Sequence, residues 1–173
     1  MSIKINYLEK PANKSFENLV LFVDENFNIN GLKKIISSIE FSYISDLLKT
    51  SDLKKKILFF KINSKKTIFL ISIKKDIKIS DIENLGAKFN SYINYDKKKE
   101  YFVNSDTINN KVKNLVGYFL HGLKLKSYEF NIYKSNKNKK IVSINVIGKK
   151  NKLSTKDHLR FKALEEGSFF ARD

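Results

Sequence analysis

The sequence contains no cysteine, no tryptophan, one proline and six glycines among 173 residues. The lack of cysteine excludes disulfide bonds and metal sites built on thiolates. Because glycines are so few, no Gly-rich phosphate loop and no Gly-x-Gly-x-x-Gly fingerprint follows any expected strand. No apolar run reaches the roughly eighteen residues that a membrane-spanning helix needs. The sequence therefore predicts a protein without membrane spans.

Arginine is also scarce, although the chain is strongly basic. Only Arg160 and Arg172 are arginines among 34 basic residues, and the formal net charge is +16. Such a charge favours a polyanionic partner, but specific phosphate and base recognition relies on the flat, bidentate guanidinium group. Lysine, asparagine and isoleucine share A/T-rich codons, so a genome rich in A and T is the favoured explanation. A lysine-rich nucleic-acid-binding domain is the alternative function.

The length and the 42% hydrophobic content suit one compact α/β domain. Six segments have the apolar pattern of β-strands: 3–8, 18–24, 57–62, 67–73, 100–103 and 141–147. The segment 18–24 is continuously apolar between polar ends, which is typical of a strand buried on both faces. Only four residues separate 57–62 from 67–73, so these strands are expected to form an antiparallel hairpin.

Apolar residues at helical spacing predict four helices. The first begins at Leu32, with a break expected near Phe41. Its expected apolar stripe consists of Leu32, Ile35, Ile36, Ile39, Tyr43 and Leu47. Residues 80–83 have the spacing of a capping box, Asp106 or Thr107 is expected to cap the third helix, and Ser154 the fourth. Helices that alternate with strands, around one hairpin, predict a three-layer α/β/α sandwich with a mixed sheet.

The sequence contains no recognisable catalytic constellation. His121 and His158 are the only histidines, and without metal-ligand spacing they are expected to serve in packing and at the surface. Glu165 and Glu166 diverge by about a hundred degrees in a helix, so both are expected to be solvated charges. HExxH, P-loop and GxSxG motifs are absent. The sequence therefore assigns no catalytic, cofactor-binding or metal-binding residue.

Three lysine-rich stretches could in principle contact nucleic acid. They are residues 54–56, 97–99 and 137–150, and the last two lie near tyrosines that could stack on bases. The tyrosines are Tyr95, Tyr101 and Tyr133. Solvated loop lysines are the favoured interpretation, since Tyr101 also fits an ordinary strand.

The end of the chain carries a family resemblance. Glu166 to Asp173 resembles the Glu-Gly-x-x-x-Ala-Arg-Asp stretch that opens the catalytic half of leucyl aminopeptidases. A second region is similar to the family's Gly-x-x-Leu-x-x-Tyr-x-Phe-x-x-Tyr-Lys pattern, with one additional residue before the first tyrosine. Its matching residues are Gly122, Leu123, Tyr128, Phe130, Tyr133 and Lys134. Residues 43–48 are similar to the family's first helix.

The resemblance implies that residues 1–150 form an amino-terminal, macro-domain-like α/β domain. Residues 151–173 would then be an interdomain linker helix that leads to a catalytic domain missing from this chain. Enzymes of this family remove amino-terminal residues from peptides with two divalent metal ions, commonly zinc, manganese or magnesium. Their metal ligands and catalytic arginine lie in the missing domain. No residue of this chain is therefore carried over as functional, and the chain itself is expected to hold no cofactor.

The implied partners are the chain's own carboxyl-terminal catalytic domain, the other subunits of a homo-hexamer, and peptide substrates that bind to the catalytic domain. A cytoplasmic location and a structural, assembly role follow from the same resemblance. A further alternative is a nucleotide or ADP-ribose binder of macro-domain type. That function requires glycine-rich loops after the strands, and we expect no heat of binding with ADP-ribose.

Overall fold

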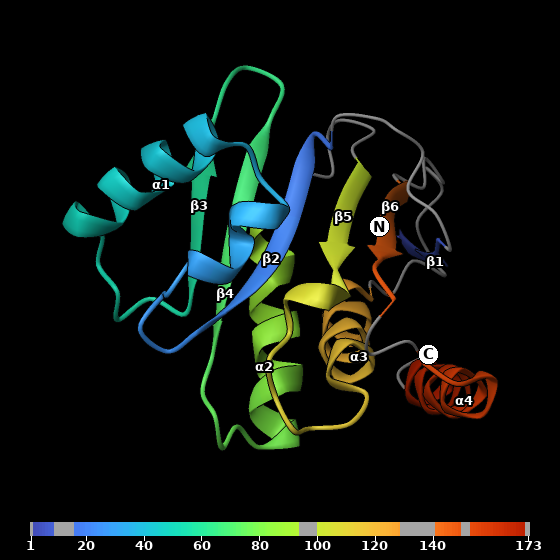
Figure 1. Ribbon diagram of the computed structural model, residues 1–173. Helices are drawn as coiled ribbons and strands as arrows, with labels where there is room; N and C mark the ends of the chain where they lie inside the picture. Colours follow the sequence, from blue (N-terminus) through green and yellow to red (C-terminus); the bar gives the residue numbers. More distant parts are fainter. Residues whose placement is uncertain (1, 9–15, 94–99, 129–140, 150–152, 172–173) are drawn as a thin grey trace.

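The computed structural model describes residues 2–8, 16–93, 100–128, 141–149 and 153–171, and its fold is α/β (Figure 1). One six-stranded sheet has the order β1-β6-β5-β2-β4-β3. The strands are β1 (Ser2–Tyr7), β2 (Asn18–Asp24), β3 (Ile57–Lys61), β4 (Thr67–Ile73), β5 (Glu100–Asn104) and β6 (Ile141–Ile147). The pair β3–β4 is antiparallel and the other described pairs are parallel. The predicted mixed sheet and its hairpin are confirmed.

Helices cover both faces of this sheet (Figure 1). In chain order they are η1 (Asn30–Lys34), α1 (Ser38–Thr50), α2 (Ile79–Phe89), η2 (Asn90–Tyr92), η3 (Ser105–Thr107), α3 (Leu115–Ser127) and α4 (Thr155–Phe170), where η marks a 3-10 helix. The elements η1 and α1 pack on one face, α2 and α3 pack on the other, and α4 lies outside α3. The predicted three-layer sandwich is therefore confirmed. No helix of the described residues is both long and apolar enough to cross a membrane.

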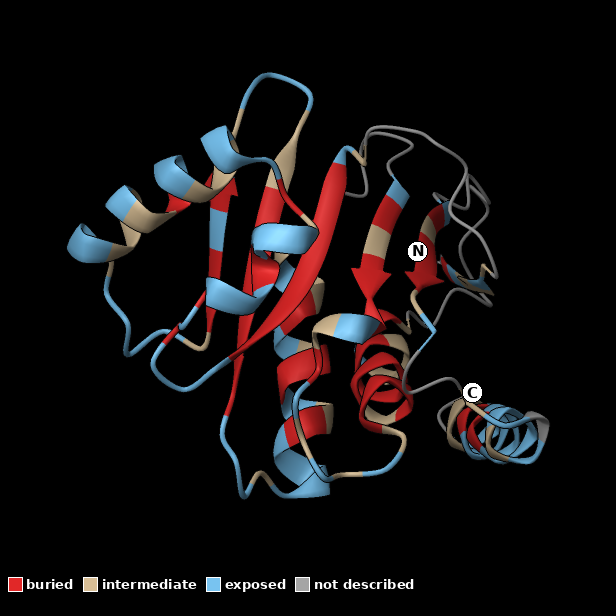
Figure 2. Cartoon of the chain, viewed as in Figure 1, coloured by how far each residue is buried: buried red, intermediate tan, exposed pale blue. Residues whose placement is uncertain are grey.

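The sheet separates two apolar cores. On β2, Leu19 and Leu21 join the core beneath η1 and α1, whereas Val20 and Phe22 join the core beneath α2 and α3. Alternate side chains of a strand point to opposite faces, so a central strand covered on both sides must be apolar throughout. Figure 2 shows the resulting continuous burial along β2, in contrast to the exposed outer surface of α1.

The helix predicted from Leu32 is interrupted earlier than expected. Leu32 belongs to η1, and α1 begins only at Ser38, after the N-cap residue Ser37. The Ser37 Oγ accepts a hydrogen bond from the Glu40 N–H at 3.3 Å, and the Ser37 N–H donates to Glu40 Oε2 at 2.9 Å. This capping box starts a new helical register. The predicted continuous stripe is therefore wrong, and Ile39 is 83% exposed.

Two predicted helix starts are also wrong. Helix α2 begins at Ile79 behind Lys78, whose side chain makes no capping hydrogen bond, so residues 80–83 do not form the predicted box. Helix α3 begins at Leu115, well after Asp106 and Thr107. Those two residues lie in η3, which directly follows β5. Ser154 does cap α4 as predicted, since its Oγ accepts a hydrogen bond from the Asp157 N–H at 3.1 Å.

Helices α2 and α3 touch through their backbones. A Cβ atom at Gly122 would overlap the carbonyl oxygen of Glu83, and one at Gly86 would overlap the carbonyl oxygen of Phe119. Gly86 in α2 and Gly122 in α3 therefore allow the two helices to pack this closely. The predicted division at residue 150 remains a prediction, because residues 150–152 lie outside the described ranges.

Candidate functional site

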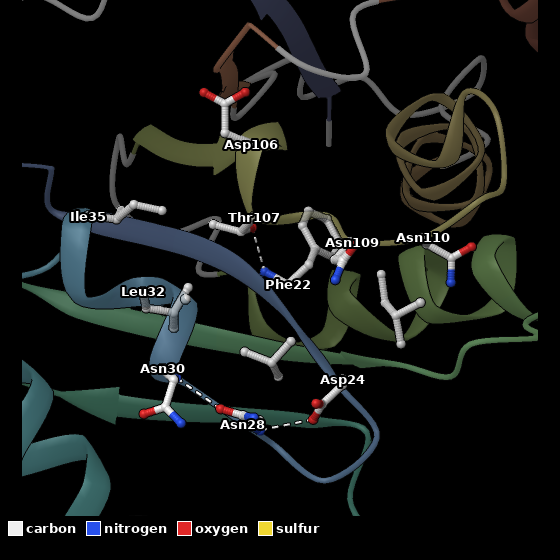
Figure 3. Close-up of a pocket in the computed structure, with 13 residues that line it drawn as sticks. Phe22, Asp24, Asn28, Asn30, Leu32, Ile35, Asp106, Thr107, Asn109 and Asn110 are labelled. Atoms are coloured by element: carbon white, nitrogen blue, oxygen red, sulfur yellow. Dashed lines mark hydrogen bonds between the residues drawn. The ribbon is translucent and has the colours of Figure 1, made fainter.

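A pocket lies at the carboxyl ends of β2 and β4, beside the segment that follows β5 (Figure 3). Strand β2 continues to η1 and α1 on one face of the sheet, whereas its neighbour β5 continues to α3 on the other face. Open α/β sheets bind ligands at such switch points, because the diverging connections leave a crevice. The cavity of about 320 Å³ lies at the small end of the range for small-molecule sites.

One wall of the pocket is the turn from β2 into η1. The Asp24 Oδ1 accepts hydrogen bonds from the backbone N–H groups of Asn26 at 3.0 Å and Asn28 at 2.9 Å. The Asn28 Oδ1 in turn accepts from the Asn30 N–H at 3.0 Å. Within this turn, Phe27 has a φ of 55° and buries its ring. The polar side chains here therefore hold the loop that bends the chain toward α1.

The opposite wall is the segment that follows β5. Thr107 Oγ1 accepts a hydrogen bond from the Phe22 N–H at 2.9 Å, which joins this segment to β2. Asp106 Oδ1 accepts from the Lys149 N–H at 2.8 Å, after the end of β6. Asn110 Nδ2 donates to the Lys74 carbonyl oxygen at 3.0 Å, just after β4. These contacts position the wall.

The chemistry of this pocket does not suit a phosphate group. Among the described residues, its lining contains no lysine or arginine, although the chain carries a net charge of +16. Two carboxylates line it, together with four asparagines: Asn28, Asn30, Asn109 and Asn110. Gly31 is its one described glycine, and its φ lies outside the positive range that phosphate-binding loops use. Neither cations nor a glycine-rich cradle would bind the phosphates of ADP-ribose here.

The described residues do not fit a two-metal peptidase site either. Within the described ranges, no group of three or more histidine or carboxylate side chains is placed to hold a metal ion. In the pocket, Asp24 and Asp106 come from opposite walls and each accepts backbone hydrogen bonds.

The two histidines lie in different places. His121 is buried in α3, with its ring centroid 5.4 Å from that of Phe161 in α4. His158 is exposed on α4, and its ring meets the edge of Tyr7 from β1 at 5.7 Å. Each histidine thus contacts an aromatic ring of another element, and neither lines the pocket.

Glu165 contradicts its prediction as a solvated charge. Its side chain is buried, forms an ion pair with Lys124 through Oε2, and places Oε1 3.4 Å from His121 Nδ1. Glu166, the next residue, is exposed. The divergence of adjacent helical residues was predicted correctly, but it turns Glu165 toward α3. The ion pair itself could not be predicted from local sequence, because its partners lie about forty positions away along the chain.

The lysine-rich stretches give no support to a base-stacking surface. Tyr101, the described tyrosine of the three, is 2% exposed and packs within the core, so it cannot stack on a nucleic-acid base. Lys54 and Lys55 are exposed in the loop before β3. Residues 97–99, 137–140 and 150 lie outside the described residues, as do Tyr95 and Tyr133.

Comparison by sequence finds no relative: no protein-family model matches this chain, and no curated protein matches it either. Comparison by structure does find similar folds. A tomato leucine aminopeptidase mutant superposes with a TM-score of 0.63 at 14% identity, covering 96% of this chain and 36% of that chain. The bottromycin maturation enzyme BotP gives 0.60 at 8% identity, with 92% and 32% covered.

The cytosol aminopeptidase from Coxiella burnetii gives a TM-score of 0.54 at 11% identity, covering 92% of this chain and 31% of that chain. The chain thus spans about a third of the length of each of these proteins. At such low identity the likeness establishes the fold alone. Nearly the whole chain therefore shares its fold with about one third of a leucine aminopeptidase chain.

Proposed function

We propose that this chain is the non-catalytic, amino-terminal domain of a leucyl aminopeptidase-type metallopeptidase, with a structural and assembly role. The observation that carries the proposal is the fold shared with a leucine aminopeptidase over 96% of this chain but only 36% of that one. The resemblance of Glu166 to Asp173 to the stretch that opens the family's catalytic half supports the same assignment.

In this proposal the complete enzyme removes amino-terminal residues from peptides with two divalent metal ions, zinc, manganese or magnesium. The metal ligands belong to a carboxyl-terminal catalytic domain, which is the first partner of this chain. Residues 151–173 form the linker to that domain, and the domain described here contributes outer contacts of a cytoplasmic homo-hexamer.

The test compares this chain with a polypeptide extended past Asp173 along the natural gene. Both are incubated with manganese and a leucine anilide, and hydrolysis is followed with and without a chelator. We expect no hydrolysis by the 173-residue chain and chelator-sensitive hydrolysis by the longer polypeptide. The proposal is wrong if the gene has its stop codon directly after Asp173, with no metal-liganding segment downstream. Metal-dependent hydrolysis by the purified short chain would equally contradict its non-catalytic role.

A further inference from the structure

Helix α4 carries apolar side chains on several of its faces. Of its described side chains, Phe161 and Glu165 are buried, at 7% and 4% exposure. Leu159 and Phe170 are 60% and 85% exposed. At 3.6 residues per turn, Phe161 and Glu165 lie on one face, whereas Leu159 and Phe170 lie about three turns apart on the opposite face. Burial of apolar surface alone would therefore not decide which face of α4 packs against α3.

The face that does pack against α3 has an apolar and a polar half. In the apolar half, the Phe161 ring meets the edge of Tyr118 at 5.1 Å and lies close against Gly117. A Cβ atom at Gly117 would lie 2.7 Å from the Phe161 ring, so the glycine makes room for this aromatic side chain. The Phe169 ring also stacks on Tyr128, directly after α3, with ring centroids 4.5 Å apart.

The polar half is the Glu165 carboxylate. One of its oxygens pairs with the Lys124 ammonium group, and the other lies 3.4 Å from His121 Nδ1. His121 and Lys124 are three positions apart in α3, so one carboxylate bridges a full turn of that helix. Burial and the Glu165 charge raise the pKa of the partly exposed Tyr7 above its usual range. Tyr7 therefore remains a neutral phenol, and Lys124 is the cation that balances Glu165.

A buried ion pair depends strongly on geometry, because the cost of removing charges from water is offset only when the partners meet well. If α4 turned its Leu159 side toward α3, the Lys124–Glu165 pair would be lost and apolar atoms would cover the Lys124 ammonium group. We propose that Glu165, held by Lys124 and His121, selects the face of α4 that packs on α3 and so fixes the rotation of α4 about its axis. This role concerns the described helices alone and does not depend on the proposed function.

The test measures the position of α4 directly. Because the chain has no cysteine, Asp46→Cys on α1 and Ala163→Cys on α4 can be spin-labelled without further changes. Pulsed electron spin resonance then gives the distribution of distances between the two labels. A helix is about 10 Å across, so a rotation of α4 moves its label by several ångströms. The parent protein is expected to give one narrow distribution.

Two neighbouring glutamates provide matched variants. Glu165→Gln keeps the shape of the side chain but removes the ion pair, and it is expected to broaden the distribution or add a second distance. Lys124→Met is expected to do the same from the α3 side. Glu166→Gln, one position along on the exposed face, is expected to leave the distribution unchanged. A narrow, unchanged distribution in Glu165→Gln overturns the proposal, as does equal broadening in Glu166→Gln.

Amide hydrogen exchange separates a local effect from global unfolding. In Glu165→Gln we expect exchange in α4 to accelerate by about tenfold, while the amides of β2 keep the rates of the parent protein. If exchange in β2 accelerates together with α4, Glu165 supports the whole domain and the assigned role in orienting α4 is wrong.

Discussion

The two interfaces of α3 are built on different principles. Toward α2, the helix backbones touch where Gly86 and Gly122 remove every side chain from the path. Toward α4, the contacts are made by the Phe161 and Phe169 rings and by one buried charged side chain, and much of the helix surface stays exposed. The first interface is specified by shape, so it tolerates no added atoms. The second combines ring contacts with an ion pair and leaves much of α4 exposed, so α4 is expected to detach locally without loss of the core.

The largest loss of stability is expected where α2 and α3 pack together on the sheet. Phe89 of α2 is fully buried and meets the rings of Phe69, Tyr101 and Phe119 at centroid distances of 5.4 to 6.0 Å. Phe89→Ala would leave a cavity and should lower the free energy of unfolding by about 3–5 kcal/mol. Urea denaturation of the variant and the parent measures this change. A loss below about 1 kcal/mol would mean that α2 is not part of the cooperative core.

Gly122→Ala should have the next largest effect. The new methyl group would overlap the carbonyl oxygen of Glu83, so α2 and α3 must separate, at a cost of about 3 kcal/mol. Gly167→Ala is the control, because its Cβ meets nothing within 4 Å and alanine is the better helix former. Thermal unfolding should therefore show a lower Tm for Gly122→Ala and an equal or higher Tm for Gly167→Ala. The opposite order would contradict backbone contact between α2 and α3.

Removal of the Phe161 ring, which lies between α4 and α3, should lower the free energy of unfolding by a smaller amount. Phe161→Ala is expected to lower global stability by about 1–2 kcal/mol, because the lost contacts involve α4 and α3 but not the sheet. Tryptic cleavage after Arg160 and Lys162 should accelerate in this variant while the rest of the chain stays resistant. Phe170→Ala serves as the control, since that ring is 85% exposed. A loss of stability as large as that of Phe89→Ala would show that the α3–α4 interface contributes as much to the stability of the core as the α2–α3 interface does.

The smallest change in stability is expected in α1, which lies on the opposite face of the sheet from α2 and α3. Burial raises the pKa of Glu40, but hydrogen bonds from Lys66 and Ser37 outweigh it, so the pKa lies below its usual range. A carboxyl pKa lowered by folding stabilises the protein fully above the unfolded value of about 4.3, and this contribution disappears as the pH falls through the lower folded value. Glu40→Gln should lower stability at pH 7 by less than about 1 kcal/mol.

The comparison of the parent with Glu40→Gln is made by urea denaturation at pH 7 and at pH 3. The difference between the two proteins should shrink at pH 3, which lies below the unfolded value of about 4.3. A difference that grows as the pH falls would contradict the direction of the pKa shift. Glu166→Gln, whose carboxylate is exposed, should show a smaller difference at both pH values.

The strands could be predicted well because strand patterns are local. Segment 18–24 coincides with β2, and the four-residue connection between 57–62 and 67–73 forced the hairpin of β3 and β4. Helix starts were harder to predict, because several polar residues competed for each cap. Ser37 with Glu40 forms a capping box, whereas the residues at 80–83, with the same spacing, do not. A capping motif indicates only a local preference for a helix start. Whether the helix begins there depends on how the helix packs in the fold.

The candidate pocket could not be predicted from residue types, since its asparagines and aspartates read as ordinary loop residues. They meet only because β2, β4 and β5 run parallel and end at one edge of the sheet. Because the two walls come from separate parts of the sequence, no single sequence motif contains both of them. Glu165 was missed in a similar way, because its partners Lys124 and His121 lie more than forty positions away along the chain.

The sequence by itself determined the α/β class, the mixed sheet and the absence of thiolate chemistry, because composition and apolar periodicity act over a few residues. Only the tertiary structure decided that Gly86 meets the α3 backbone, that the described lining of the pocket contains no lysine, and that Glu165 rather than Glu166 is buried. Those outcomes depend on which helix face meets which neighbour across some forty residues of chain. The packing of the whole domain therefore determines which helix face is buried.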